Sequence, residues 1–237
     1  MNVAVVTGAS RGIGRAIAQR FVNAGVAVVL AQRGEAEPGG RTVCVRADVA
    51  EDGAAAAIFA AAEDAFGPVD VLVNNAADQT VKALLALTLD DWDAMLRTNV
   101  AGAAACIAEF ARRRIAAGGG GAVVNVGSIE GVQPAQGHVH YAASKAALAQ
   151  LTRGAALELG RHGIRVNLVA PGLVWSPTLE RDWPDGVERW LARAPLGRLA
   201  RAEDVADACF FLASDAASFV TGAELRVDGG VLAQSAF

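Results

Sequence analysis

Short apolar runs alternate with helical patterns along the whole chain, and this alternation limits its fold more than any other feature does. The runs are four to six residues long and rich in valine, as in strands that are buried on both faces of a parallel sheet. Predicted strands cover residues 3–6, 26–31, 42–46, 69–73, 122–126, 165–170 and 224–227. We therefore expect one doubly wound α/β domain over residues 1–237, with about seven parallel strands and helices on both faces.

Helical patterns rich in alanine fill the intervals between these runs. Gly25 follows the first helix as a C-cap residue, and Thr88 is a suitable N-cap for the third. Predicted helices cover residues 15–24, 52–66, 88–114, 141–160 and 203–213. A loop that contains Gly and Pro is expected over residues 35–41. Residues 173–200 show no strand pattern, and their prolines should divide them into short pieces.

Composition and charge exclude several classes of protein. Hydrophobic residues make up 53% of the chain and charged residues 19%, which is typical of a globular protein. The formal net charge of −4 gives no sign of a nucleic-acid partner, and no apolar run is long enough to cross a membrane. Cys44, Cys106 and Cys209 are too scattered for a disulfide framework or a zinc site. Unpaired thiols, and a start at Met1 without a signal-peptide pattern, lead us to expect a cytoplasmic protein.

A glycine-rich turn joins the first predicted strand to the first predicted helix. Residues 7–14 read Thr-Gly-Ala-Ser-Arg-Gly-Ile-Gly, so the glycines are spaced Gly-x-x-x-Gly-x-Gly. Glycines in such a turn let backbone amides and the positive end of the helix dipole approach a phosphate group. They would also suit a tight strand-to-helix connection that binds nothing. Their place after the first strand favours a nucleotide site.

The end of the second predicted strand indicates which nucleotide the site prefers. In dinucleotide-binding folds an acidic residue at this place usually holds the ribose hydroxyls of NAD. Here the strand ends in Gln32 and Arg33, and Arg11 lies in the glycine-rich turn. Two guanidinium groups without a carboxylate would attract a 2′-phosphate, so we expect NADP(H) to be favoured over NAD(H). Two arginines that simply face solvent are the alternative. Asp48 follows the third strand, where its carboxylate could accept a hydrogen bond from an adenine amino group.

Tyr141 and Lys145 form the most unusual pair in the sequence, because the chain has one tyrosine and two lysines. On the helix predicted over residues 141–160, a spacing of four places both side chains on one face. A nearby ammonium group favours the phenolate and should lower the pKa of Tyr141, which would make this residue an acid–base catalyst. An isolated Tyr-x-x-x-Lys is usually a surface pair, so its interpretation depends on the rest of the chain.

Further residues at predicted strand ends and within helices complete a recognisable set. The set consists of residues 7–14, Asp48, Asn74, Asn75, Ala76, Asn99, Ser128, Tyr141, Lys145, Pro171 and Gly172. In this order the set resembles the short-chain dehydrogenase/reductase family over essentially the whole chain, in particular its 3-oxoacyl-thioester reductases and its polyol or sugar dehydrogenases. A departure is Ala77, where the family usually has glycine. The resemblance implies a Rossmann-type sheet and an NAD(P)(H)-dependent oxidoreductase that interconverts a ketone and a secondary alcohol by hydride transfer.

The resemblance also implies roles for four catalytic residues. Ser128 would hold the substrate oxygen, and Tyr141 would exchange a proton with it. Lys145 would lower the pKa of the tyrosine and bind the nicotinamide ribose, while Asn99 would anchor a chain of water molecules to Lys145. These roles suit the chemistry, because a hydride that reaches a carbonyl carbon leaves an alkoxide, which positioned O–H donors stabilise.

Cofactor and substrate residues follow from the same comparison. The cofactor residues would be Gly8, Ser10, Arg11, Gly12, Ile13, Gly14, Gln32, Arg33, Asp48, Val49, Asn75, Ala76, Tyr141, Lys145, Pro171, Gly172, Val174 and Ser176. The expected substrate residues are Ser128, Glu130, Gln133, His138 and Trp175. His138 and His140 form a His-x-His without a carboxylate or cysteine at a supporting spacing, so we expect a histidine that lines the pocket and no metal site.

Residues 173–200 are expected to form a mobile lid over the substrate, because they follow Pro171 and Gly172 and contain three of the four tryptophans. The alternative is that these tryptophans cover the core or a subunit contact. The long alanine-rich helices that begin near Thr88 and Tyr141 should pair between copies of the chain. We therefore expect a homotetramer, or at least a dimer.

Two other functions are compatible with parts of the pattern. A non-catalytic, dinucleotide-binding regulatory protein would keep the fold, although the intact Asn99, Ser128, Tyr141 and Lys145 favour an enzyme. Hydrolysis by Ser128 and a histidine is disfavoured, because the sequence Gly-x-Ser-x-Gly is absent. The expected partner is a small carbonyl or alcohol substrate.

Overall fold

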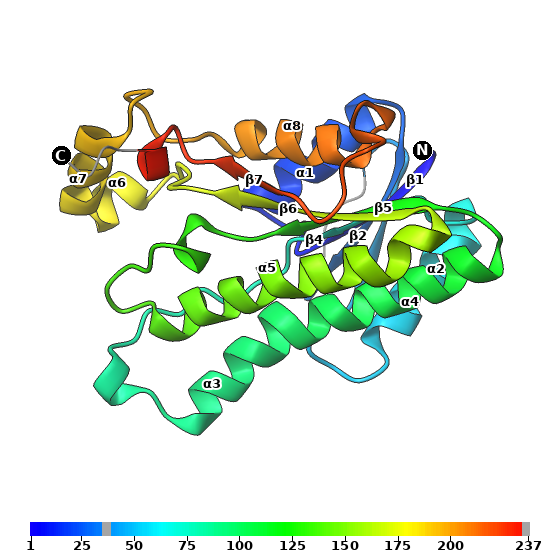
Figure 1. The fold of residues 1–237 in the computed structure, drawn as a ribbon, viewed down its shortest axis with the longest axis horizontal. Coiled ribbons are helices and arrows are strands. Elements are labelled where there is room, and N and C mark those ends of the chain that lie inside the picture. Colours follow the sequence, from blue (N-terminus) through cyan, green and yellow to red (C-terminus); the bar gives the residue numbers. More distant parts are fainter. Residues whose placement is uncertain (35–38, 234–237) are drawn as a thin grey trace.

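A computed structural model describes residues 1–34 and 39–233, and within them seven parallel strands form one sheet (Figure 1). The strands are β1 (Val3–Thr7), β2 (Ala27–Gln32), β3 (Thr42–Arg46), β4 (Val71–Asn74), β5 (Gly121–Val126), β6 (Ile164–Pro171) and β7 (Glu224–Val227). Their order is β3-β2-β1-β4-β5-β6-β7. The strand order therefore reverses between β1 and β4: β1 to β3 extend towards one edge of the sheet, and β4 to β7 extend towards the other. Doubly wound sheets bind ligands at the carboxyl ends of the strands beside such a reversal.

Helices cover both faces of this sheet. The helices of eight or more residues are α1 (Gly12–Asn23), α2 (Ala54–Phe66), α3 (Leu89–Leu96), α4 (Ala103–Ala116), α5 (Val139–Leu159), α7 (Pro184–Arg193) and α8 (Ala202–Ala213). α1 and α8 pack on one face, and α2, α4 and α5 pack on the other, above and below the sheet in Figure 1. Every residue of β1, β2 and β4 is buried, which is why these strands are unbroken apolar runs rather than alternating ones.

The predicted sheet is confirmed, and the main difference from the predictions lies inside one helix. Residues 88–114 are expected to form a single helix, but the structure has α3, then a π-helix (Arg97–Gly102), then α4. Thr88 caps α3 as predicted, because its hydroxyl accepts a hydrogen bond from the backbone of Asp91. Gly102 lets the π-helix approach the loop after β3, since a Cβ there would lie 2.7 Å from the carbonyl oxygen of Val49.

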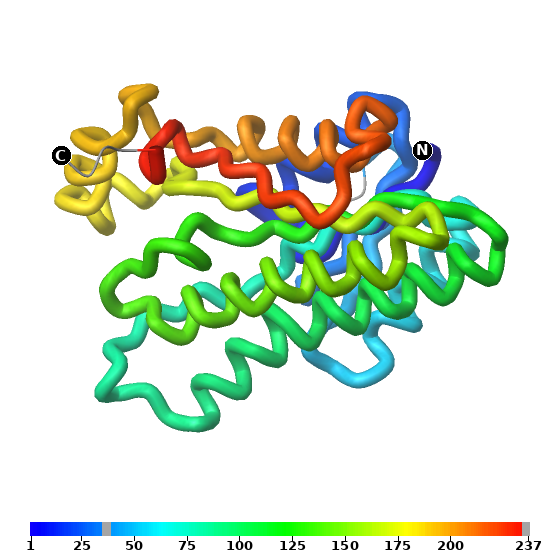
Figure 2. The backbone as a smooth tube through the Cα atoms, in the orientation of Figure 1, coloured from blue at the N-terminus to red at the C-terminus, as the bar shows by residue number. Residues whose placement is uncertain are grey.

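Residues 173–200 fold beyond the carboxyl ends of the strands. They contain the short helix α6 (Leu179–Asp182) and then α7, as expected from the prolines in this segment. Figure 2 shows the segment in yellow and orange at one end of the molecule, close to the last described residues. The predicted loop over residues 35–41 lies partly outside the described residues. Among the helices of the described chain, none has the length and hydropathy that a membrane crossing requires.

Candidate active site

Ser128 and Tyr141 meet at the carboxyl end of β5. Ser128 caps a short 3₁₀ helix (η3, Ile129–Gly131), where its Oγ accepts a hydrogen bond from the backbone N of Glu130 at 3.1 Å. Tyr141 is buried in the first turn of α5. The two side chains lie close enough for Ser128 to lower the pKa of the Tyr141 phenol. Two O–H groups from different segments therefore converge at one point of the sheet edge.

Lys145 is buried one turn further along α5, on the helix face that its spacing from Tyr141 predicts. Its Nζ donates a hydrogen bond of 2.9 Å to the carbonyl oxygen of Val126, the last residue of β5. The same Nζ lies 5.5 Å from the centre of the Tyr141 ring. Burial lowers the pKa of the Lys145 ammonium to about 8, because the charged form loses its hydration. Lys145 thus ties α5 to the end of β5.

The pKa of Tyr141 differs from the expectation based on Lys145. Burial raises the pKa of Tyr141 to about 12, hydrogen bonds with Ser128 and Gln79 act in the opposite direction, and the Glu130 carboxylate raises it. Desolvation dominates, because a buried phenolate would lose the water that stabilises its charge. The phenol is therefore protonated at ordinary pH and available as a proton donor.

Gln79 is a neighbour of Tyr141 that the sequence analysis does not identify. It lies in the irregular segment that follows β4, and its side chain hydrogen-bonds the phenol and lowers the pKa of Tyr141. A hydrogen bond with this effect is one that stabilises the phenolate, so the Gln79 amide donates to the phenolic oxygen. In the sequence, Gln79 is marked only as a polar side chain shortly after the small residues Ala76 and Ala77, at the carboxyl end of a central strand.

Asn99 lies buried in the π-helix between α3 and α4. Its Oδ1 accepts a hydrogen bond from the backbone N of Asp78 at 2.7 Å, and its Nδ2 donates to the backbone O of Asp78 at 3.0 Å. Nδ2 also lies 2.9 Å from Oγ of Ser144, the residue before Lys145. Asn99 therefore joins the segment after β4, which carries Gln79, to α5. π-helical turns occur mostly at functional sites.

Glu130 and His138 form a pair beside Tyr141. Nδ1 of His138 lies 2.9 and 3.1 Å from the two carboxylate oxygens of Glu130. The His138 ring packs edge-on against the Tyr141 ring, with 5.5 Å between their centres. Across the described part of the chain, no three His, Cys, Asp or Glu side chains are grouped to hold a metal ion. His140 is buried separately and packs edge-on against Trp92.

The glycine-rich turn lies at the carboxyl end of β1. Gly8 and Gly12 have φ angles of 66° and 54°, in the left-handed region that favours glycine. A Cβ on Gly14 would lie 2.2 Å from the carbonyl oxygen of Gly8, so a side chain there would prevent α1 from beginning so close to β1. Ser10 and Arg11 are exposed at this turn, and Arg11 makes no side-chain cap on α1. The N–H groups at this helix N-terminus suit a phosphate.

Asn75, which the sequence analysis places at the cofactor, braces the glycine-rich turn. Its Nδ2 donates to the carbonyl oxygens of Thr7 and Gly8, both at 3.0 Å. The hydroxyl of Thr7 accepts hydrogen bonds from the backbone N atoms of Asn75 and Ala76 at 3.0 and 3.1 Å. The ends of β1 and β4 are therefore locked together, and the donors of the Asn75 side chain are used within the protein.

Gln32 is 3% exposed at the end of β2, and its Nε2 and Oε1 have no hydrogen-bond partner within residues 1–34 and 39–233. An unpaired buried amide is costly, which fits a group that binds a polar ligand. The side chain of Arg33 is 82% exposed, and its Nη1 lies 3.9 Å from a carboxylate oxygen of Asp48. A carboxylate therefore lies near Arg33, but it belongs to Asp48 after β3 and not to a residue at the end of β2.

The other predicted residues lie along the same edge of the sheet. Pro171 ends β6, and Val174 forms an isolated bridge with Ala200. Trp175 is 51% exposed, and Ser176 and Gln133 are also exposed. Trp190 packs against Gly172 instead, since a Cβ on Gly172 would lie 2.5 Å from its ring. The tryptophans of this segment are thus divided between packing and exposure.

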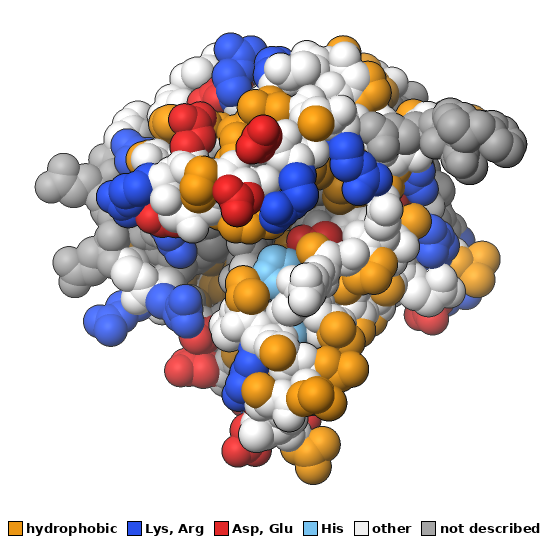
Figure 3. Space-filling view, turned by 90° about the vertical axis from the view of Figure 1, so that its left-hand side faces the viewer, with side chains coloured by type: hydrophobic (Ala, Val, Ile, Leu, Met, Phe, Trp, Pro, Cys, Tyr) orange, Lys and Arg blue, Asp and Glu red, His pale blue; other side chains and the backbone are white. Residues whose placement is uncertain are grey.

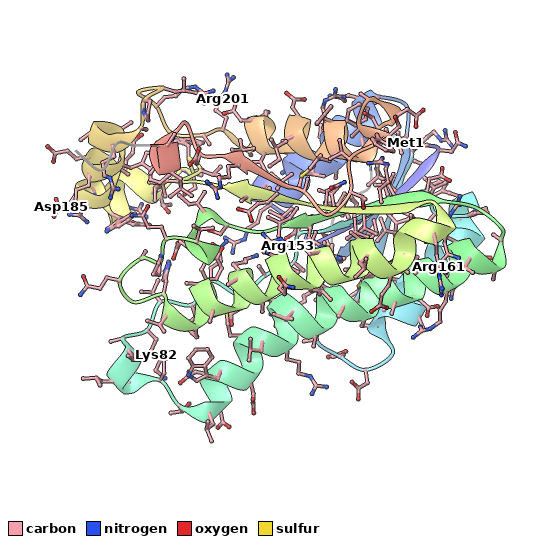
Figure 4. The ribbon with its side chains drawn as sticks, in the orientation of Figure 1. Met1, Lys82, Arg153, Arg161, Asp185 and Arg201 are labelled. Carbon is pink, nitrogen blue, oxygen red and sulfur yellow. The ribbon has the colours of Figure 1, made fainter. Side chains whose placement is uncertain are left out.

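Two segments flank this edge of the sheet. Figure 4 shows Lys82, from the segment before α3, and Asp185, from α7, on opposite sides of it. Lys82 is fixed by its Nζ, which lies 2.6 Å from a carboxylate oxygen of Asp91. Figure 3 views the molecule from this side and shows histidine in a hollow between hydrophobic and charged side chains.

Known proteins resemble this chain over almost its whole length. Residues 8–232 match the family model described as enoyl-(acyl carrier protein) reductase. Cis-4-hydroxycyclohexanecarboxylate dehydrogenase of Sinomonas cyclohexanicum is 44% identical over 242 residues, which cover 98% of this chain and 97% of that protein. L-xylulose reductase of Bos taurus is 40% identical over 243 residues, which cover 97% of this chain and 96% of that protein.

A solved structure agrees with these matches. A protein from Sinorhizobium meliloti 1021, described as a short-chain alcohol dehydrogenase, has a TM-score of 0.93 and 34% sequence identity. The match covers 99% of this chain and 97% of that one. Fold, site and likeness together show that the chain belongs to the short-chain dehydrogenase/reductase family. It is an NAD(P)(H)-dependent oxidoreductase that interconverts CH–OH and C=O groups.

Proposed function

We propose that Ser128 and Tyr141 are the catalytic groups at the reacting oxygen. The two hydroxyl groups bind the substrate oxygen, and Tyr141 gives its proton to the alkoxide that develops during carbonyl reduction. The observation that carries this proposal is the placement of Ser128, after β5, and of Tyr141, in the first turn of α5, close enough for Ser128 to lower the pKa of the phenol. Positioned O–H donors stabilise negative charge as it develops, and a phenol that stays protonated at neutral pH suits this role.

Lys145 and Asn99 complete the proposed catalytic set. Lys145 holds the second turn of α5 against Val126 and presents an ammonium group beside Tyr141. Asn99 positions this part of α5 through Ser144 and positions Gln79 through the backbone of Asp78. In this proposal Asn99 acts through its neighbours, and Lys145 also binds the ribose next to the nicotinamide.

The residues at the carboxyl ends of β1, β2 and β3 fit a nicotinamide dinucleotide, which when bound supplies or accepts the hydride. The backbone of the glycine-rich turn and the N-terminus of α1 would hold its phosphates. The unpaired amide of Gln32 would hold hydroxyls of the adenosine ribose. Asp48 and Val49 would line the adenine, and residues 171–176 would line the nicotinamide. The close packing at Gly14, where a Cβ would lie 2.2 Å from the carbonyl oxygen of Gly8, holds the N-terminus of α1 against this turn and supports the assignment.

NADP(H) is the cofactor that we favour. Arg11 and Arg33 are exposed beside the predicted ribose site, and position 32 carries a neutral amide. Asp48 does not cancel this argument, because an ion pair at 3.9 Å with a largely exposed arginine is weak. The guanidinium group of Arg33 is therefore able to turn towards a 2′-phosphate.

The proposed substrate is a small ketone or secondary alcohol under a lid formed by residues 173–200. The exposed Trp175 and the short helices α6 and α7 support the lid. The sequence resembles two branches of the family, the 3-oxoacyl-thioester reductases and the polyol or sugar dehydrogenases. The relatives named above act on a hydroxylated cyclohexanecarboxylate and on L-xylulose.

A homotetramer, or at least a dimer, is proposed from the open groove between α4 and α5. Its small and apolar lining residues include Ala104, Ile107, Ala108, Ala111, Leu151, Gly154 and Ala155. Small side chains let two copies of these helices approach closely. Light scattering at micromolar concentration should give at least twice the 24.2 kDa of one chain.

A cytoplasmic location is proposed from cysteine usage. All three cysteines are free, and burial raises the pKa of the Cys106 thiol to about 12. Buried thiols of this kind are unreactive and suit a reducing compartment.

The central test of the proposed function is Tyr141→Phe, which keeps the ring and removes the proton. Turnover of carbonyl substrates should fall by about 10²–10⁴-fold, the usual contribution of a positioned acid. Cofactor binding, followed by fluorescence, should persist in the variant. Turnover within about tenfold of the unmodified protein would remove Tyr141 from the central role.

A further inference from the structure

The Glu130–His138 pair has no task in the reduction of a simple ketone. Ser128 and Tyr141 suffice to bind the reacting oxygen, and the pair lies beside them. The backbone N of Glu130 donates to Ser128, and the ring of His138 packs against the ring of Tyr141. Both side chains of the pair are therefore held next to the predicted position of the substrate carbonyl.

We propose that Glu130 and His138 form a hydroxyl-binding subsite, so that the preferred substrate carries a hydroxyl on the carbon beside the reacting carbonyl. The substrate is then an α-hydroxy ketone in reduction and a vicinal diol in oxidation. This inference rests on the proposed function, because it places the substrate oxygen at Ser128 and Tyr141.

The hydrogen-bonding capacity of the pair matches a hydroxyl group. An ionised carboxylate has about four lone-pair sites, and Nδ1 of His138 occupies only part of the Glu130 carboxylate. Nδ1 faces Glu130, and Nε2 is the ring nitrogen for which residues 1–34 and 39–233 supply no hydrogen-bond partner. That nitrogen accepts a hydrogen bond in the neutral tautomer and donates one in the imidazolium form. A hydroxyl both donates and accepts, so it suits each residue: it donates to a free lone pair of the Glu130 carboxylate or to Nε2 of neutral His138, and it accepts from Nε2–H of the protonated ring.

Charge and exposure distinguish a hydroxyl from other groups. The side chains of His138 and Glu130 are 22% and 20% exposed, which leaves each partly open and partly desolvated. A carboxylate repels an anionic group on the neighbouring carbon. His138 already lies on this carboxylate and, when protonated, offsets its charge, so a substrate cation gains little. A thioester chain without a hydroxyl gives the remaining lone pairs of the Glu130 carboxylate no partner, which disfavours the 3-oxoacyl branch.

The test compares two ketones that differ by one hydroxyl, 3-hydroxy-2-butanone and 2-butanone, with 4-hydroxy-2-butanone to test hydroxyl position. Each is assayed with NADPH and with NADH, so that cofactor preference does not enter the result. The unmodified protein should show a kcat/KM for 3-hydroxy-2-butanone at least about tenfold above those for the other two ketones, the discrimination expected of one charged hydrogen bond.

Two variants of the full chain locate the preference. His138→Phe keeps an aromatic ring against Tyr141 and removes both ring nitrogens, and Glu130→Ala removes the carboxylate. Each should bring the ratio of kcat/KM values for 3-hydroxy-2-butanone and 2-butanone to within about threefold of one. Glu203→Gln, at an exposed carboxylate in the first turn of α8, should leave the ratio unchanged. If Glu130→Ala does not fold, Glu130→Gln keeps the volume and should still lower the ratio.

A binding measurement separates recognition from a structural role. Calorimetry of 2,3-butanediol with the cofactor-loaded Tyr141→Phe protein reports the contact without turnover, and Glu130→Ala added to this protein should weaken binding about tenfold or more. A ratio near one in the unmodified protein, or a ratio unchanged in both variants, overturns the inference. If none of the three ketones is reduced with either cofactor, the proposed function itself fails.

Discussion

Asn99 and Asp78 are 21 residues apart in the chain and are joined by two hydrogen bonds, from the Asp78 backbone N to Oδ1 and from Nδ2 to the Asp78 backbone O. One side-chain amide thus satisfies both polar groups of a single peptide residue. This contact depends on the π-helix, which turns Asn99 inward, and it holds the segment that carries Gln79 next to Tyr141.

Asn99→Ala should therefore lower both stability and turnover. Loss of the amide leaves the Asp78 backbone groups unpaired, which should cost about 1–3 kcal/mol of unfolding free energy. Misplacement of Gln79 and Tyr141 should lower kcat by about tenfold or more. Denaturant unfolding and steady-state kinetics measure the two effects. Ser144→Ala is the matched control, because it keeps both bonds to Asp78 and should cost less. Equal losses in the two variants would contradict a special role for the two hydrogen bonds between Asn99 and Asp78.

Lys145 should make stability depend on pH between about 7 and 10. Burial lowers the pKa of the folded-state ammonium to about 8 from 10.5. In this range the unfolded state binds more protons than the folded state, so stability rises with pH. Relative to Lys145→Met, the unmodified protein should gain roughly 2 kcal/mol over the range.

The pKa of Tyr141 is raised from 10.0 to about 12, so its stabilisation is present below pH 10 and is lost above it. The pH range below 10 therefore reports Lys145. Denaturant unfolding of the two proteins at several pH values measures the difference. Parallel stability curves would show that the pKa of Lys145 is the same in the folded and unfolded states.

Cofactor choice should depend on Gln32 and Arg33. Replacing them with Asp and Ala adds an acid for the ribose hydroxyls and removes a guanidinium from the 2′-phosphate. The ratio of dissociation constants for NADPH and NADH should move towards NADH by about tenfold or more, since charged hydrogen bonds are the stronger ones. Fluorescence titration gives both constants without turnover. If the unmodified protein already binds NADH more tightly than NADPH, the proposal that Arg11 and Arg33 attract a 2′-phosphate is wrong.

Trp175→Ala should change the ranking of substrates while leaving the melting temperature nearly intact. The side chain is 51% exposed in the segment that follows β6, so little packing is lost. Trp190→Ala is the contrasting variant, because Trp190 packs against Gly172 and its loss should lower the melting temperature by several degrees. Equal loss of activity for all substrates in Trp175→Ala, with a large fall in melting temperature, would indicate a structural tryptophan.

Elements whose causes are local can be predicted from the residues around them. Short runs of valine and other apolar residues predicted every strand of the described sheet within two residues at each end. The cap at Thr88 and the pairing of Tyr141 with Lys145 on one helix face need only short-range spacing. The glycine-rich turn likewise follows from its place between a strand and a helix.

Features that depend on burial or on distant segments are set by tertiary packing. The π-helix at Asn99 satisfies a backbone 21 residues away, and no pattern within residues 88–114 specifies that partner. Gln79 reaches Tyr141 because β4 and α5 end at the same edge of the sheet. The pKa of Tyr141 rises rather than falls, because desolvation outweighs the hydrogen bonds that the phenol accepts. The spacing of residues along one helix predicts which charged groups are neighbours. The pKa of a side chain also depends on its hydration, which is set by every segment that packs around it.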